Sequence, residues 1–474
     1  MQMGAEGTAQ TGFVSCLDFS RCNVHMIGIG GSGMSGAAKM LVNLGAFVAG
    51  SDVTAFPGMG ALVNSGVRLQ IGHQKDLLDR RTDLVVYSAA IPQSNAELQE
   101  AGRRGIPCIK YAELLGALMA AREGVAIAGT HGKTTTTAMC AFALQQAELK
   151  PSFIFGAHSE QLGGSSGVGS GPHFVVESCE FDRSFLHLHP HAAAILNVER
   201  DHPDCFRNLE EVVEAFAQFS ENVAPQGLLV CNADCPSAMA AAQRTRAELQ
   251  TFAIDAEADW RAVNLRIGGQ VVAFDVRYGG STVMSVELVV PGRHNVANAL
   301  AAAALASYFG ADHDTIASAI SRFAGVSRRL TWRGARGGVN IIDDYAHHPT
   351  EIRVSLEAVR GRYHPKRTWV VFQPHQHERT RSLLDDFAKA FTGADEIVIP
   401  DVFDAREADS DKHPVGSEVL ASRICENGGR ARYVHTLEEA ADHVARNVVD
   451  GDLVVTMGAG DVWRVADALV ARVC

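Results

Sequence analysis

The chain of 474 residues is too long for one hydrophobic core, and at about 150 residues per domain we expect about three domains. Hydrophobic residues make up 47% of the chain and charged residues 20%, which excludes a predominantly disordered protein. The formal net charge of -12 makes the chain a poor candidate for sequence-independent binding to nucleic acid or to an anionic membrane, because such binding requires a basic surface.

Strand and helix patterns alternate in the first part of the chain, which is typical of a parallel α/β domain. The predicted elements are strands over 24–29, 46–51, 84–87 and 106–109 and helices over 33–44 and 112–120. A break at 121–124 ends this part, so we predict a first, Rossmann-like domain over residues 1–122.

A second α/β part follows, and its end carries a different pattern. The predicted elements are strands over 125–128, 174–176, 193–198 and 228–231, a helix from about 134, another over 209–221, and an exposed Gly/Ser-rich loop over 162–172. Alternation with Gly-Gly turns over 262–290 indicates antiparallel hairpins, a β appendage, before helices over 295–309 and 315–323. We predict a P-loop ATPase-like central domain over 123–325.

The last part of the chain again alternates strands and helices. The predicted strands cover 339–342, 368–372, 396–399 and 453–457, and the predicted helices cover 350–359, 379–391, 415–424, 437–447 and 462–473. We predict a C-terminal Rossmann-like domain over 326–474, and thus three α/β domains, each a mostly parallel sheet with flanking helices.

The ten cysteines are scattered from Cys16 to Cys474 without a CxxC pair, which favours neither a zinc ribbon nor a disulfide framework. The N-terminal residues lack a basic segment followed by an apolar run, and no apolar run is long enough to span a membrane. We expect a cytoplasmic protein with reduced thiols, a monomer or homodimer, that binds neither nucleic acid nor membrane.

A glycine-rich turn, Gly28-Ile29-Gly30-Gly31-Ser32-Gly33, stands between the first predicted strand and the first helix. Its glycines allow backbone N–H groups to approach a phosphate, and the helix N-terminus favours an anion. Asp52 ends the next strand, where a ribose-binding acid is expected. The pattern predicts a nucleotide-binding turn without fixing the nucleotide, and an ordinary structural turn is the alternative.

A second loop, Gly129-Thr130-His131-Gly132-Lys133-Thr134-Thr135-Thr136-Thr137, also lies between a strand and a helix. Exposed amides, one lysine and a hydroxyl at a helix start hold the β- and γ-phosphates and the Mg²⁺ of a nucleoside triphosphate. Ile127 stands where the strict spacing has glycine, so the loop is a shortened one. The sequence predicts a triphosphate site, and a Thr-capped helix with an exposed lysine is the alternative.

Acidic and other polar residues follow two strands of the same predicted domain. They are Glu177, Glu180 and Asp182 after the first strand, and Asn197, Glu199, Asp201, His202 and Asp204 at the end of the second. Because the carboxyl ends of parallel strands share one crevice with the phosphate loop, we predict a second Mg²⁺ bridging two phosphoryl-bearing ligands. Histidine is an uncommon Mg²⁺ ligand, so His202 either binds the ion or supports a ligand. Solvated loop acids are the alternative.

Four further polar clusters occur later in the chain: Gly292-Arg293-His294-Asn295, Arg328-Arg329, and the stretches 343–350 and 373–381. Two neighbouring arginines can stabilise the charge of a transferring phosphate, and surface solvation is the alternative. Pro349 and Thr350 alone would explain a helix start. The last two stretches end predicted strands, so we expect them to face the central domain.

At these motifs the chain resembles the Mur ligase family, roughly from Asn23 to the C-terminus. The motifs that carry the resemblance are GIGGSGMSG, GTHGKTTTT, NVERDH, GRHN, GVSRR, DDYAHHPTE, FQPH and MGAGD. The resemblance implies a first domain for a UDP-sugar, a central ATPase domain, and a C-terminal domain that closes over the site and contributes amino-acid and ATP contacts.

The resemblance also implies roles for single residues. UDP-sugar contacts are implied for Gly28, Gly30, Gly31, Ser32, Gly33, Asp52 and Ser88. ATP contacts are implied for Gly129, Thr130, His131, Gly132, Lys133, Thr134, Thr135, His294, Asn295, Arg329 and Asp344. Metal ligands are implied at Thr134, Glu177 and His202, and an amino-acid pocket at Tyr345, His348, His375 and Arg379. The implied catalytic residues are Lys133, Glu177, His202 and Arg329.

The chain departs from the family pattern at two places that bear on the site. Cys179 replaces an acid of the usual EADESD stretch, and Gln376-His377 replaces the usual Arg-Tyr after FQPH, which removes a positive charge near the substrate carboxylate. Arg379 or Arg381 is expected to compensate. Several sister ligases use a carbamylated lysine near the metals, but no lysine lies between Lys150 and Lys366, which favours the alanine-adding branch.

The expected activity is ATP-dependent amide-bond formation between the carboxylate of UDP-N-acetylmuramate and L-alanine, through an acyl phosphate, in peptidoglycan precursor synthesis. ATP and two Mg²⁺ ions are the expected cofactors. A related ligase that adds a preformed peptide or another amino acid is the closest alternative. A nicotinamide-dependent oxidoreductase would leave residues 129–137 unexplained, and a non-catalytic sensor would follow if Cys179 and Gln376 had disabled the chemistry.

Overall fold

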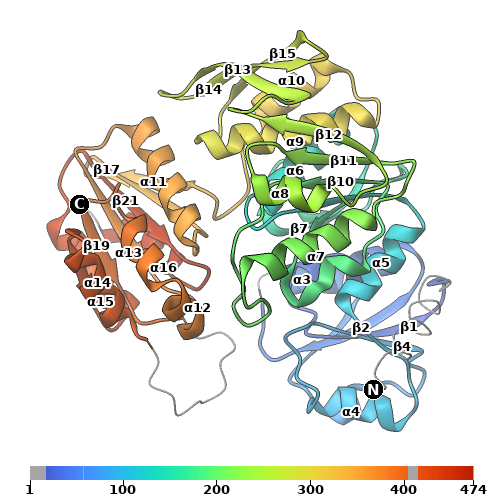
Figure 1. Cartoon of the computed structure of the whole chain (residues 1–474). Helices are drawn as coiled ribbons and strands as arrows, with labels where there is room; N and C mark the ends of the chain where they lie inside the picture. The colour runs from blue at the N-terminus through green and yellow to red at the C-terminus, as the bar shows by residue number, and fades with distance from the viewer. Residues whose placement is uncertain (1–17, 57, 404–414, 473–474) are drawn as a thin grey trace. The chain divides into compact units, whose positions relative to one another are not determined.

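The computed structural model describes residues 18–56, 58–403 and 415–472 (Figure 1). Backbone contacts divide the chain into two compact units. The first unit holds residues 1–198, 213–252 and 301–316, and the second holds 199–212, 253–300 and 317–474. Cys16, Cys474 and the N-terminal segment for which no secretory signal is expected lie outside the described residues.

The first unit begins with a five-stranded parallel sheet in the order β3-β2-β1-β4-β5. Its strands are β1 (Asn23–Ile27), β2 (Phe47–Asp52), β3 (Arg68–Ile71), β4 (Leu84–Tyr87) and β5 (Cys108–Lys110). Its helices are α2 (Ser32–Asn43), α3 (Met59–Asn64), α4 (Ala96–Arg103) and α5 (Tyr111–Ala120). The strand order reverses between β1 and β4, and in open α/β sheets that switch point is where ligands bind, beside the turn after β1.

The same unit continues with seven neighbouring strands in the order β12-β11-β10-β6-β9-β7-β8, all parallel except β8. They are β6 (Glu123–Ala128), β7 (Ser152–Ser159), β8 (Gly164–Gly167), β9 (His173–Ser178), β10 (Ala192–Ile195), β11 (Leu228–Asn232) and β12 (Glu248–Ala253). The accompanying helices are α6 (Lys133–Gln146), the 3-10 segment η2 (Phe181–His187), α7 (Leu209–Glu221) and α8 (Pro236–Ala242). The phosphate loop follows β6, which lies between β9 and β10.

The second unit contains the predicted β appendage. Strands β13 (Trp260–Arg266), β14 (Val272–Tyr278) and β15 (Ser281–Leu288) pair antiparallel through the two Gly-Gly turns. Helices α9 (Arg293–Tyr308) and α10 (His313–Arg322) follow in the chain. The predicted switch from helical periodicity to alternation is therefore confirmed.

The second unit also contains a six-stranded sheet in the order β16-β17-β21-β18-β19-β20. Its strands are β16 (Thr331–Arg336), β17 (Val339–Asp344), β18 (Arg367–Phe372), β19 (Glu396–Ile399), β20 (Ala431–Tyr433) and β21 (Asp452–Met457). Its helices are α11 (Pro349–Tyr363), α12 (His377–Ser382), α13 (Leu384–Ala390), α14 (Ser417–Glu426), α15 (Leu437–Asn447) and α16 (Trp463–Arg472). All pairs are parallel except β16–β17.

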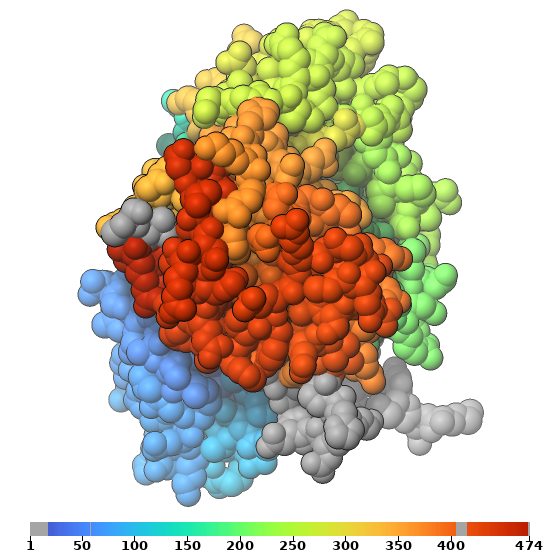
Figure 2. All heavy atoms as spheres, turned by 90° about the vertical axis from the view of Figure 1, so that its left-hand side faces the viewer, coloured from blue at the N-terminus to red at the C-terminus, as the bar shows by residue number. Residues whose placement is uncertain are grey.

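Both faces of this last sheet are buried, which explains why its strands are continuously apolar. On β18, Val370 and Phe372 pack against α11, α13 and α14, while Trp369 and Val371 pack against α15 and α16. Figure 2 shows one outer face of this part of the chain, in orange and red. The fold class, mostly parallel α/β sheets with flanking helices, is confirmed, whereas the domain limits 1–122, 123–325 and 326–474 stay a prediction.

Two local predictions differ from the structure. The loop predicted over 162–172 contains the short strand β8, because its small residues pair with β7 at a sheet edge. The helix predicted over 379–391 is two helices, α12 and α13, which meet at Leu383 in a non-helical conformation.

A search of the described residues finds no helix with the length and hydropathy of a membrane-spanning segment.

Candidate functional site

The glycine-rich turn after β1 is held by the end of β2. The N–H groups of Gly28 and Ile29 donate to the carbonyl of Ser51 at 2.9 and 3.1 Å. The N–H of Gly30 donates to Oδ2 of Asp52 at 2.7 Å. Gly31 precedes α2 and no side chain caps that helix, so its N-terminal amides are suited to an anion.

Two other predicted contacts of the sugar nucleotide lie beside this turn. A Cβ at Gly28 would lie 3.2 Å from Cβ of Ser88, and φ of Gly28 is +77°, so glycine is required there on both counts. The structure brings together the predicted residues Gly28 to Gly33, Asp52 and Ser88. The carboxylate of Asp52 faces the turn itself, and its contact with a ribose stays a prediction.

A buried carboxylate supports the same strand end, and no sequence pattern indicated it. Glu97 has no exposed surface, and its oxygens lie 2.5 Å from Nε2 of His25 and 2.9 Å from Nδ1 of His73. The hydroxyl of Ser51 donates to Glu97 at 2.9 Å. Burial opposes ionisation of Glu97, but the hydrogen bonds from His25, Ser51 and His73 hold its pKa below the ordinary value.

The phosphate loop is fixed by Asn197, which follows β10. The N–H of Thr130 donates to the Asn197 carbonyl at 3.0 Å, and the N–H of His131 donates to the side-chain oxygen at 2.7 Å. Gly132, with φ of +83°, precedes α6 without a side-chain cap. The loop therefore presents helix N-terminal amides from a fixed position.

Lys133, the first residue of α6, folds back over this loop. Its Nζ donates to the carbonyls of Gly129 and Thr130 at 2.5 and 3.0 Å and to Oε2 of Glu180 at 2.8 Å. Burial opposes the charge on Lys133, but the Glu180 carboxylate raises its pKa above the ordinary value. Lys133 is therefore a charged ammonium group. Glu180, one of the acidic residues expected at the crevice, is its ionic partner.

Thr134 and Glu177, two predicted metal ligands, lie side by side. The Thr134 hydroxyl donates to Oε1 of Glu177 at 2.8 Å, and the N–H of Gly156 donates to Oε2 at 2.6 Å. The register of β9, in which Glu177 pairs with Ile127 of β6, carries the carboxylate to the loop. A hydroxyl and a carboxylate are the hard oxygen donors that Mg²⁺ prefers, so the pair fits such an ion. His202 belongs to the second unit, and its place in a metal site stays a prediction.

In the second unit, Asp201 and Arg379 form a buried ion pair. Nη2 of Arg379 lies 2.9 Å from Oδ1 of Asp201, and the two side chains are 3% and 6% exposed. Nη2 also lies 3.4 Å from Nδ1 of His202. Burial opposes the charge on Asp201, but Arg379 holds its pKa far below the ordinary value.

His347 and His348 lie near this ion pair, and their imidazole groups have different surroundings. Burial lowers the pKa of His347 to about 3, against the pull of Glu351, and the charge of Arg379 adds to the lowering. The Nδ1 atom of His348 accepts the N–H of Thr350 at 3.2 Å, so Nε2 carries the proton and donates to the Arg200 carbonyl at 3.2 Å.

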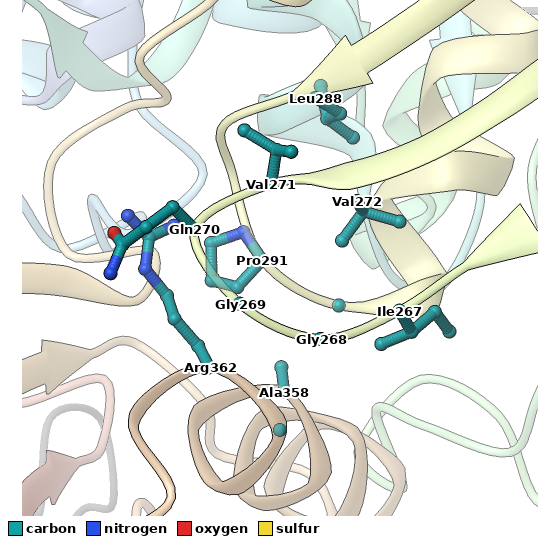
Figure 3. A pocket seen from close by; sticks show the side chains of 12 residues that line it. Ile267, Gly268, Gly269, Gln270, Val271, Val272, Leu288, Pro291, Ala358 and Arg362 are labelled. Carbon is teal, nitrogen blue, oxygen red and sulfur yellow. The ribbon is translucent and has the colours of Figure 1, made fainter.

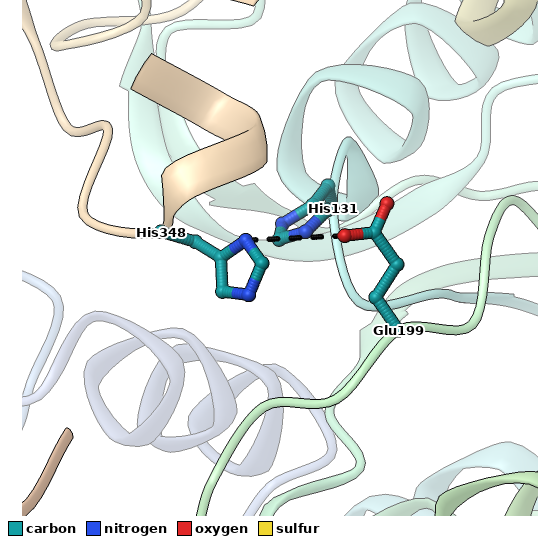
Figure 4. Close-up of side chains that lie close together, drawn as sticks. All are labelled: His131, Glu199 and His348. Carbon is teal, nitrogen blue, oxygen red and sulfur yellow. Dashed lines mark ion pairs between the residues drawn. The ribbon is translucent and has the colours of Figure 1, made fainter. Parts of the chain in front are cut away.

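Figure 4 shows His348 turned toward Glu199, whose carboxylate lies 4.0 Å from its Nδ1. Glu199 also accepts a hydrogen bond from the Thr350 hydroxyl at 2.7 Å. The NVERDH motif and the start of α11 are thus joined inside this unit.

Tyr345 lies between two arginines of the GVSRR motif. The guanidinium carbons of Arg328 and Arg329 lie 5.1 and 5.0 Å from the centre of its ring. Arg328 is held by Asp343 and by the carbonyls of Gly458 and Gly460, which gives it a structural role. Arg329 lies 3.7 Å from Glu351, a looser contact that suits the predicted catalytic arginine better.

Asp344 and Asn295 are engaged within the fold. Asp344 accepts hydrogen bonds from the N–H of Ala346 and the hydroxyl of Ser355, and burial raises its pKa to about 6. Asn295 donates to the Pro291 carbonyl at 2.7 Å. Their contacts with ATP, like that of His294, stay predictions.

A small pocket lies beside the GRHN motif. The turn at Gly268–Gly269, Pro291 and the α11 residues Ala358 and Arg362 line it, as Figure 3 shows. Nη1 of Arg362 donates to the Val289 carbonyl at 2.5 Å, which ties α11 to the segment after β15.

His375 of the predicted amino-acid pocket stacks on Phe403, with ring centres 6.0 Å apart.

Comparisons with known proteins cover nearly all of the chain. Residues 23–123 match the model of the Mur ligase family, catalytic domain, residues 127–306 the Mur ligase middle domain, and residues 328–460 the Mur ligase, glutamate ligase domain. The UDP-N-acetylmuramate--L-alanine ligase of Acetivibrio thermocellus is 38% identical over 94% of this chain and 95% of its own. That of Pelotomaculum thermopropionicum is 40% identical over 95% of this chain and 97% of its own.

Two solved structures are also similar. UDP-N-acetylmuramate-alanine ligase from Thermotoga maritima has a TM-score of 0.80 at 28% identity, covering 95% of this chain and 98% of that chain. A murein peptide ligase from Psychrobacter arcticus has a TM-score of 0.71 at 25% identity, covering 95% and 98%.

Proposed function

Because the chain belongs to the Mur ligase family, we propose that it joins the carboxylate of UDP-N-acetylmuramate to L-alanine at the expense of ATP. The observation that carries the proposal is the arrangement at the start of α6, where Lys133 folds over the loop and Thr134 touches Glu177. A charged ammonium group and a magnesium-type oxygen pair at a helix N-terminus are what binding of a triphosphate requires.

The reaction needs activation because a carboxylate does not react with an amine at neutral pH. A carboxylate oxygen of the sugar nucleotide attacks the γ-phosphorus of ATP, the bond to the β–γ bridging oxygen breaks, and ADP leaves. The amine of L-alanine then attacks the acyl phosphate carbonyl and loses a proton. The tetrahedral intermediate collapses by breaking its bond to the phosphate oxygen, which yields amide and inorganic phosphate.

The residues of the first unit serve the phosphoryl transfer. Lys133 offsets negative charge on the β- and γ-phosphates, and the amides before α6 hold them in line. Thr134 and Glu177 would hold Mg²⁺, which would offset negative charge on the phosphates, and a second ion near His202 is part of the proposal. Asn197 presets the loop amides and Gly156 presets the Glu177 carboxylate, so these two parts of the site need little reorganisation during the reaction.

The residues of the second unit serve the amino acid. Arg379 carries a guanidinium group suited to a carboxylate, and its ion pair with Asp201 supports this role. Gln376 carries no charge, so Arg379 takes the main part in holding the α-carboxylate. We place Tyr345, His348 and His375 around the same substrate. ATP and the sugar nucleotide are cytoplasmic metabolites, so we propose a cytoplasmic enzyme, acting as monomer or homodimer.

One assay tests this function. We expect ADP release in the presence of UDP-N-acetylmuramate and L-alanine, less with glycine or L-serine, and none with a tripeptide. Lys133→Ala should lower turnover by about a thousandfold, and Lys75→Ala, an exposed lysine, should not change it. Release of ADP only with the tripeptide would instead assign the peptide-adding activity named for the Psychrobacter arcticus structure. Reduction of a nicotinamide without ADP release would assign the oxidoreductase.

A further inference from the structure

The hydroxyl group of Tyr111 lies at the N-terminus of α2. A Cβ built on Gly33 would lie 2.4 Å from the Tyr111 oxygen and 2.7 Å from its Cζ. The phenol therefore occupies the space that any side chain at Gly33 would take. Gly33, the last glycine of the first motif, is therefore needed for more than the start of α2. The absence of a side chain at this position leaves room for the Tyr111 hydroxyl group.

Tyr111 is held in this place by several contacts of its own helix. It is the first residue of α5, and the preceding N–H of Lys110 donates to Glu113 at 2.7 Å. Nζ of Lys110 lies 2.6 Å from Asp182 of η2. Helix α5 packs closely on η2, since a Cβ at Gly116 would lie 2.3 Å from the His187 carbonyl. The phenol is thus on a rigid element.

The position of α2 is equally well defined. Gly36 lies against Ser166 of β8, where a Cβ would be 2.8 Å from the serine Cβ, and against Ile154 of β7. The glycine turn and the phosphate loop therefore belong to one compact unit, and Tyr111 lies with them.

The electrostatic surroundings keep the hydroxyl group protonated. Burial raises the pKa of Tyr111, and the carboxylate of Glu177 raises it further. The phenol is therefore a neutral hydrogen-bond donor in the neutral range of pH. Tyr111 is partly buried, and among the described residues none accepts a hydrogen bond from its hydroxyl group.

We propose that Tyr111 donates its hydroxyl hydrogen to an anionic oxygen of the sugar nucleotide, either of the diphosphate or of the reacting carboxylate. The hydroxyl group adjoins the uncapped amides of α2, where the diphosphate is proposed to bind. The charge of Glu177, beside which we propose that the γ-phosphate is transferred, also acts on it. The inference rests on the proposed function, because it takes the sugar nucleotide as the ligand.

Tyr111→Phe tests the inference by calorimetric titration of the whole protein with UDP-N-acetylmuramate in the absence of ATP. A hydrogen bond to a charged group is worth enough that its loss should raise the dissociation constant about tenfold or more. The dissociation constant of an ATP analogue should stay the same. Tyr278→Phe is the matched control, since Tyr278 stacks on Trp260 in the β appendage.

The titration is repeated with UDP-N-acetylglucosamine, which keeps the diphosphate but lacks the carboxylate. Equal weakening of both ligands assigns the hydrogen bond to the diphosphate, and weakening of UDP-N-acetylmuramate alone assigns it to the carboxylate. If Tyr111→Phe binds both ligands within twofold of the unaltered protein, the inference is wrong while the proposed function stands. If the unaltered protein binds neither, the proposed function itself fails.

Discussion

Nζ of Lys133 lies 2.8 Å from Oε2 of Glu180, and the two side chains are 11% and 2% exposed. The lysine that should bind the phosphates of ATP is therefore already paired with a buried carboxylate. An arriving phosphate must share or displace this partner, because one ammonium group cannot fully satisfy both.

Glu180→Gln is expected to tighten nucleotide binding. The amide keeps the shape of the side chain but removes the negative charge that competes for Lys133, so the dissociation constant of an ATP analogue should fall about threefold or more. Equilibrium dialysis measures it directly. Glu160→Gln, whose side chain is 94% exposed, serves as control, and weaker binding by Glu180→Gln would contradict the competition.

Glu177→Gln is expected to raise the magnesium requirement. Loss of the carboxylate leaves the Thr134 hydroxyl without its charged partner, and an amide oxygen is a weaker ligand for a hard cation. The Mg²⁺ concentration for half-maximal ADP release should rise about tenfold. An unchanged magnesium titration would remove Glu177 from the metal site.

Glu97→Gln is expected to destabilise the first sheet. A hydrogen bond to a charged group is worth about 1.5–3 kcal/mol, and here two histidines and Ser51 would lose the same charged partner. Urea unfolding measures the loss. Glu100→Gln on the same helix breaks only a surface pair with Arg103, so less than about 1 kcal/mol is expected. Similar losses of unfolding free energy in both variants would show that the buried contacts of Glu97 add nothing to stability.

His347 is expected to make the protein less stable in mild acid. Its pKa falls from the ordinary 6.5 to about 3 on folding, mainly through burial. As the pH drops below 6.5, the unfolded chain takes up a proton that the folded chain refuses, so its contribution to the free energy of unfolding decreases until about pH 3. Titration of His347 therefore changes the free energy of unfolding by at most about 1.4 kcal/mol per pH unit.

Urea unfolding at several pH values checks this dependence. His347→Gln should flatten the profile between pH 6.5 and 4, whereas His435→Gln, an exposed histidine, should leave it as it is. A profile of unchanged slope in His347→Gln would mean that this imidazole is charged in the folded protein.

The sequence predicted those parts of the site that lie at the ends of parallel strands. Thr134 and Glu177 are 43 positions apart, yet their meeting followed from the expectation that their two strands run parallel and end at one crevice. The glycine turn and Asp52 were brought together by the same rule. Periodicity and strand order are enough for such neighbours.

Contacts that depend on irregular backbone could not be predicted. Glu180 reaches Lys133 from a segment in which Asp182 and Arg183 adopt positive φ, and no residue pattern announces that turn. The Glu97 arrangement joins residues from β1, β2 and the start of α4, with His25 and Glu97 separated by 72 positions. Strand β3 was missed because it is a short edge strand whose side chains are mostly exposed.

The pairing of Glu177 with Ile127 restricts where residues can be inserted into or deleted from this chain. Side chains alternate between the two faces of a strand, so a single deletion within β9 would turn the carboxylate away from Thr134. The turn just before β8 carries no such restriction, because Gly163 is exposed and an added Cβ there would meet no neighbouring atom within 4 Å. Natural or engineered insertions should therefore be tolerated near Gly163 and rejected between His173 and Ser178.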